Sequence, residues 1–110
     1  MEIELDENEH RVVTILNKFG FIPIECNIIV VIRRHGTIDT KGIAEALGTT
    51  RERVRKYTAR LQTSGVIDST MYRHGFIYKL RLDFFDNLYA IAEQRYRDDI
   101  RRIKVLEEIF

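Results

Sequence analysis

The sequence predicts a single, mainly α-helical domain that carries one small β-hairpin and ends in a long helix. Three patterns along the 110 residues indicate this fold class. Apolar residues recur at helical spacing through most of the first 64 positions, alternate with polar ones from 76 to 82, and return every seven positions after residue 83. We expect residues 1–82 to form the domain and residues 83–110 the carboxyl-terminal helix.

Composition limits the class of protein. With 45% apolar side chains, 110 residues can bury a core without metal or disulfide support, and the single cysteine, Cys26, has no internal partner. The longest nearly uncharged stretch, residues 19–32, is too short and too polar to cross a bilayer. The chain opens without a basic, apolar leader, so we expect an intracellular protein that does not enter a membrane.

Four helices are expected before residue 66. The first covers residues 8–18 and ends at Gly20. Residues 24–34 combine the strand propensity of an Ile/Val run with helix punctuation at both ends, and we interpret them as a buried helix. Thr40 is the candidate N-cap of a short third helix that ends at Gly48, and a fourth helix follows and ends at Gly65.

The third and fourth helices, with the hairpin after them, predict a winged helix-turn-helix. Ala44 allows the two helices to cross closely, Gly48 permits the turn, and Val54 anchors the second helix of the motif. Val66 and Ile67 start one short strand, and the alternating apolar residues from 76 to 82 form the next, with the hairpin tip at residues 73–75.

Nucleic acid is the partner that the charge pattern favours. Residues 51–82 carry a net charge of +6, whereas residues 1–50 carry −3 and residues 83–110 carry −2. The charged side chains of the fourth helix lie opposite its apolar stripe, where they can enter a major groove; the alternative is a solvated face. The candidate DNA-binding residues are Thr49, Thr50, Arg51, Glu52, Arg53, Arg55, Lys56, Arg60, Tyr72, Arg73 and His74.

Chemistry assigns these candidates different roles. Arginines such as Arg51 and Arg55 suit guanine edges, and Glu52 can accept from cytosine. Arg53, Arg60 and the two threonines are placed for phosphates. The tip residues 72–74 could touch a minor groove, a phosphate or an unpaired base, or form a plain solvent turn.

We expect neither an enzyme nor a metal or other cofactor site. The three histidines, His10, His35 and His74, have no further ligands at metal spacing, and Cys26 lies in an apolar run typical of a buried thiol. The sequence contains no catalytic triad pattern and no Gly-rich phosphate loop.

The last 28 residues carry an apolar seam with two interpretations. It either folds back on the domain or pairs with a second chain, and a helix about 40 Å long favours an intermolecular partner. The candidate interface residues are Tyr89, Ala92, Tyr96, Ile100, Ile103, Leu106 and Phe110.

The order of features resembles the amino-terminal domain of the transcription factor IIE alpha subunit and of archaeal transcription factor E. The likeness covers most of the chain. It rests on Val12-Val13 before the turn at residues 19–21, on the helix from Glu25 to Arg33-Arg34, on residues 51–61, and on residues 73–80 followed by 96–102. The hairpin tip is shorter than in that family, and no CxxC pair supplies its zinc ribbon.

This resemblance implies a general initiation factor that bridges RNA polymerase and promoter DNA, favours the open complex and binds a second initiation-factor subunit. It would act in the nucleus of a eukaryote or in the cytoplasm or nucleoid of an archaeon. Two alternatives use the same basic helix. One is a homodimeric, sequence-specific repressor that resembles MarR-type regulators, and the other is an architectural DNA-binding protein.

Overall fold

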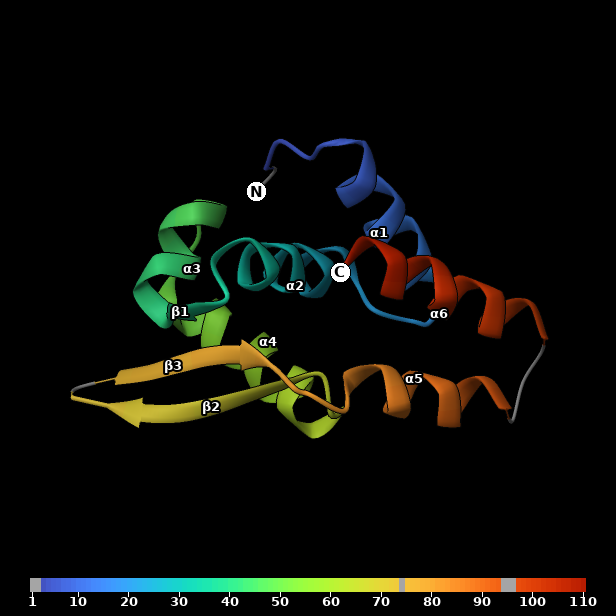
Figure 1. Cartoon of the computed structure of the whole chain (residues 1–110). Coiled ribbons are helices and arrows are strands. Elements are labelled where there is room, and N and C mark those ends of the chain that lie inside the picture. Colours follow the sequence, from blue (N-terminus) through green and yellow to red (C-terminus); the bar gives the residue numbers. More distant parts are fainter. Residues whose placement is uncertain (1–2, 74, 94–96) are drawn as a thin grey trace.

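The computed structural model describes residues 3–73, 75–93 and 97–110. Within them, six helices and a three-stranded antiparallel sheet confirm the mainly α-helical fold class with a small hairpin (Figure 1). The elements are α1 (Glu7–Lys18), α2 (Pro23–His35), β1 (Thr37–Asp39), α3 (Thr40–Leu47), α4 (Arg51–Thr63), β2 (Ile67–Tyr72), β3 (Gly75–Leu80), α5 (Phe84–Glu93) and α6 (Arg97–Ile109).

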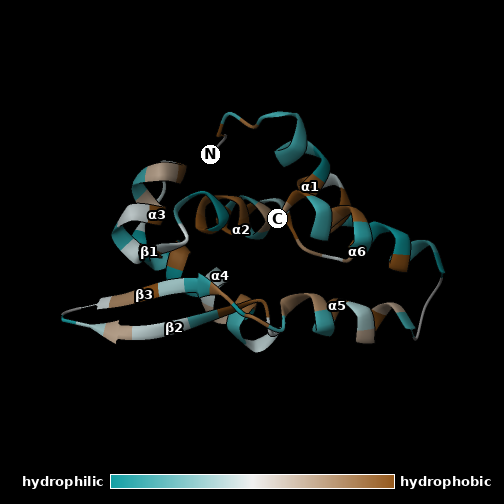
Figure 2. Cartoon of the chain, viewed as in Figure 1, coloured by the Kyte–Doolittle hydropathy of each residue, from teal (hydrophilic) through white to brown (hydrophobic). Residues whose placement is uncertain are grey.

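Helix α2 forms the centre of the core. Pro23 opens it, and the Glu25 carboxylate accepts the N–H of Ile22 at 3.0 Å, which satisfies a backbone donor at the helix start. Its residues 28–32 are all buried, because α1, α3, α4 and β3 pack around it. The predicted buried helix is confirmed, and the hydropathy colouring shows apolar turns of α2 at the middle of the molecule (Figure 2).

Three local features set the ends of α3 and the start of α4. The Asp39 carboxylate accepts the Gly42 N–H at 2.7 Å, so Asp39 is the N-cap of α3 and the expectation for Thr40 is wrong by one position. Gly48 ends α3 in the left-handed conformation, with φ of 63°. Thr50 then caps α4 by accepting the Arg53 N–H at 3.2 Å.

The sheet has the order β1-β3-β2, and the hairpin of β2 and β3 forms the wing. Tyr72 pairs with Gly75, which leaves a two-residue tip where Arg73 adopts a φ of 52°. Strand β1 was not predicted, because three residues are too few to show a period of two. Leu82, which we expected to continue β3, lies beyond its end and is fully exposed.

The carboxyl-terminal segment corrects the prediction of one long helix. Helices α5 and α6 pack side by side, and α6 also contacts α1 (Figure 1). The rings of Phe84 and Phe110, near the two ends of the segment, lie 6.0 Å apart. Arg33 of α2 donates to the Ile109 carbonyl and places its guanidinium 5.3 Å from the Phe110 ring centroid. Folding back buries apolar surface that a continuous helix would expose.

None of the helices in the described part of the chain is both long enough and apolar enough to span a membrane.

Candidate nucleic-acid interface

The outer face of α4 exposes its charged side chains, as the sequence predicts. Val54, Thr58 and Leu61 are buried, and this apolar stripe fixes α4 against the core. The exposed residues on the other side include four cations that make no ion pair with any described residue: Arg51, Arg53, Arg55 and Lys56. Glu52 and Ala59 are exposed on the same helix.

Arg60 differs from these four cations. Its Nε lies 3.7 Å from the Glu25 carboxylate, which is almost fully buried at the start of α2. Its guanidinium also lies 5.7 Å from the Tyr57 ring centroid, and Lys56 approaches the same ring at 5.3 Å. Arg60 therefore ties the carboxyl-terminal half of α4 to α2, a link that spacing along the sequence does not reveal.

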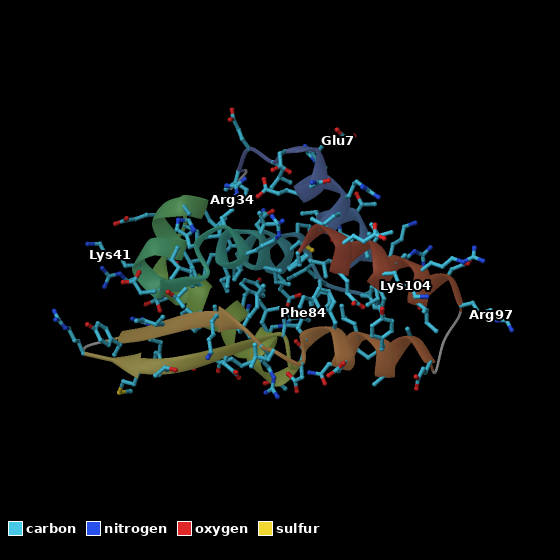
Figure 3. All side chains as sticks on the ribbon, viewed as in Figure 1. Glu7, Arg34, Lys41, Phe84, Arg97 and Lys104 are labelled. Atoms are coloured by element: carbon cyan, nitrogen blue, oxygen red, sulfur yellow. The ribbon has the colours of Figure 1, made fainter. Side chains whose placement is uncertain are left out.

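A hollow of about 530 Å³ lies between the start of α3, the start of α4 and the wing. The apolar lining comes from the sheet, with Ile38, Phe76 and Ile77 among its residues. The cations that line it come from α3, α4 and the wing tip: Lys41, Arg51, Arg55 and Arg73. Lys41 was missed by sequence reasoning, because it lies ten residues before the basic helix; it extends outward from α3 (Figure 3).

The wing presents an exposed, partly apolar outer end. Met71 is 69% exposed, Tyr72 55% and Phe76 38%. The Arg73 guanidinium lies 5.4 Å from the centroid of the Tyr72 ring, so the cation and the aromatic surface are offered together. His74, the remaining candidate at the tip, lies outside the described residues.

The candidate partner seam contributes to the core of the monomer. Ala92, Ile103 and Leu106 are at most 1% exposed, and Tyr89, Ile100 and Phe110 are half-buried. This differs from the exposed seam that the sequence favoured, since α6 has folded onto α5 and α1. Tyr96 lies outside the described residues. A hydrogen bond to the Glu107 carboxylate, together with desolvation, raises the pKa of Tyr89 to about 12.

The remaining polar groups of interest serve the fold. Glu9 accepts two hydrogen bonds from Arg34, at 2.6 and 2.7 Å, and this ion pair joins α1 to α2. Burial raises the pKa of the Cys26 thiol to about 12, and its Sγ donates to the Asn17 side chain at 3.4 Å. The described residues contain no group of three metal-ligating side chains.

The helix-turn-helix, the basic outer face of α4 and the three-stranded sheet define the class of fold: a winged helix-turn-helix protein. No family model and no curated protein matches the chain.

Solved structures are similar in fold at low sequence identity. The YusO protein from Bacillus subtilis aligns with a TM-score of 0.61 and 15% identity, covering 93% of this chain and 69% of that one. A MarR variant from E. coli complexed with operator DNA aligns with a TM-score of 0.59 and 12% identity over 93% of this chain and 84% of that one. A MarR-family transcriptional regulator from Rhodococcus sp. RHA1 aligns with a TM-score of 0.60 and 13% identity, covering 88% of this chain and 65% of that one. These likenesses establish the winged helix-turn-helix fold and add no support specific to transcription factor IIE alpha.

Proposed function

We propose that this protein is a DNA-binding transcription regulator of the MarR type, which acts as a homodimer. The observation that carries the proposal is the set of four cations on the exposed face of α4 that pair with no described carboxylate, beside a cation-lined hollow that continues onto the wing. A duplex offers a matching surface, because a helix fits the major groove while the flanking phosphates meet basic side chains. The operator complex of the similar MarR structure supports this interpretation.

The geometry divides the α4 residues by role. Arg51 and Arg55 line the hollow from the exposed face and are proposed to contact base edges or the nearest phosphates, with Glu52 accepting from cytosine. The phosphate contacts are proposed for side chains around the start of α4 and the wing tip: Lys41, Thr49, Thr50, Arg53, Lys56, Tyr72, Arg73 and His74. Arg60 is proposed to orient α4 through Glu25 rather than to lead in DNA contact.

The interface is tested by replacing one cation on the proposed face and one on the opposite side of the molecule. Arg55→Ala should weaken binding to a duplex and reduce the salt dependence, since one fewer counterion-releasing contact lowers the slope of log K against log salt by about 0.9. Arg97→Ala removes the same charge from an exposed residue at the far end from Lys41 (Figure 3) and should leave both unchanged. Fluorescence anisotropy over a salt series measures this. Equal slopes for the wild type and Arg55→Ala would contradict the proposed face.

The oligomeric state separates this proposal from the initiation-factor role that the IIE alpha resemblance implies. A homodimer with two α4 helices about 34 Å apart would bind a palindromic site of matching spacing. Light scattering of the purified protein, alone and with heterologous duplex, should therefore give a stable dimer. A monomer that is retained by purified cognate polymerase and binds DNA with little sequence preference would instead favour the initiation factor. A dimer with a small ratio of specific to non-specific affinity would favour an architectural protein.

A further inference from the structure

Three hydroxyl groups from three elements meet beneath the wing. The Tyr78 Oη of β3 lies 3.2 Å from the Thr40 Oγ1 at the start of α3 and 3.4 Å from the Thr58 Oγ1 in the middle of α4. All three residues are buried, at 6% exposure or less. The described residues show no other side-chain hydrogen bond from β3 to either helix of the motif.

The protons in this cluster form one directed chain. Thr58 has a single hydroxyl proton, and its shortest acceptor is the Val54 carbonyl at 2.8 Å. The Tyr78 proton can then be donated to the Thr58 oxygen, while Thr40 donates its own proton to Tyr78. Each buried hydroxyl is thus satisfied, and the chain ends on the backbone of α4.

Above this cluster the wing and α4 separate. A second hollow, of about 180 Å³, lies between them and is lined by Thr58 and Tyr78 together with residues farther out such as Ala59 and Phe76. Beyond it the wing is exposed, with Met71 as its most exposed apolar side chain at 69%. The inner end of the wing is held by the pairing of β1 with β3 and by the packing of β2 against α4. The hydroxyl cluster adds a direct side-chain link from β3 to α4 at the point where the two begin to separate.

We propose that Tyr78 is a positioning residue whose hydroxyl fixes the wing relative to α4, so that the wing and the exposed face of α4 fit the same stretch of duplex. The proposal rests on the proposed function, because a fixed angle between wing and helix matters when both touch one rigid ligand. Tyr78 itself is buried and touches no DNA. Its effect on binding passes through the residues at the wing tip, of which Arg73 is the described cation.

The position of the wing can be measured without DNA. Spin labels at Met71→Cys on the wing and Thr63→Cys on α4 report the distance between two exposed sites, and the native Cys26 is buried. Tyr78→Phe should broaden the distance distribution. Thr40→Val should do the same, because it removes the hydroxyl that donates to Tyr78 while keeping the side-chain shape. Thr14→Val is the matched control, because it removes an exposed hydroxyl on α1 that donates to the His10 carbonyl, away from the wing. Unchanged distributions in both Tyr78→Phe and Thr40→Val would overturn the proposal.

DNA affinity then tests the link to function. Tyr78→Phe should weaken duplex binding by up to about fivefold, the limit reached if DNA must reorder the wing at the full cost of one hydrogen bond, and Thr14→Val should not. In an Arg73→Ala background the effect of Tyr78→Phe should shrink, because the wing contact that it positions is already lost, whereas in an Arg55→Ala background it should persist. Equal effects in both backgrounds would overturn the positioning role. If the wild type binds no DNA but the distributions still broaden, the proposed function fails while the structural role of Tyr78 stands.

Discussion

Ile103→Ala distinguishes an internal seam from one that pairs two chains. Ile103 is 0% exposed in α6, and replacing a buried isoleucine by alanine costs about 2–5 kcal/mol, from lost burial and the cavity left behind. We take about 3 kcal/mol as the expected loss. A domain of 110 residues unfolds with an entropy of about 0.23 kcal/mol/K, so this loss lowers Tm by about 13 °C.

Circular dichroism melts at several protein concentrations measure this shift. Leu82→Ala is the matched control, because Leu82 is fully exposed and has no burial to lose. The Tm of this variant should change by less than about 3 °C, because truncating an exposed side chain removes almost no buried apolar surface. The reasoning is refuted if Ile103→Ala melts within 3 °C of the wild type. It is also refuted if the loss disappears at high protein concentration, because mass action would then place Ile103 between chains.

Three further outcomes follow from local features. Hydrogen bonds from Arg34 hold the pKa of Glu9 below its ordinary value of 4.5, against the opposing effect of burial. The ionised carboxylate therefore stabilises the fold above about pH 4.5, and this stability is lost as the pH falls through the lower pKa of the folded state. Glu9→Gln should destabilise the protein by about 1 kcal/mol at neutral pH and flatten the decline in acid, as measured by urea unfolding at each pH. Gly48→Ala should lower the free energy of unfolding by about 1 kcal/mol in thermal melts, because φ at this position is 63°. Space is not the cause, since a Cβ there meets nothing within 4 Å. Gly75→Ala is equally open and has no positive φ, so it should cost less. Cys26, with its pKa raised to about 12, should react with a thiol reagent at pH 8 only after denaturation, and rapid labelling of the native protein would contradict its burial.

The helix-turn-helix and the wing were predictable because their signals are local. Gly48 ends α3, a threonine opens α4, and alternation marks β3, each within a few residues of the feature it sets. The buried face of α4 follows from helical spacing, so the exposed position of Arg51 and Arg55 was predictable as well.

The parts that sequence missed depend on contacts between distant segments. Strand β1 exists because Ile38 pairs with Tyr78, forty residues later, and three residues carry no pattern of their own. The seven-residue spacing in the last segment describes a buried stripe equally well in one long helix or in two short ones. The choice between them rests on Phe110 reaching Phe84 and Arg33, which no local pattern contains.

The basic surface of α4 is polarised, and this affects how the helix could meet DNA. The sequence predicts a phosphate contact for Arg60, but Arg60 lies beside the buried Glu25 and its charge is partly neutralised there. The α4 cations that pair with no described carboxylate therefore concentrate in the first half of the helix, where the N–H groups of the helix start also carry positive potential. Both effects draw an anionic ligand to the same end of α4, and the cation-lined hollow with Lys41 and Arg73 opens at that end. An insertion of α4 by its amino-terminal half, with the wing alongside, is the arrangement in which these charges act together.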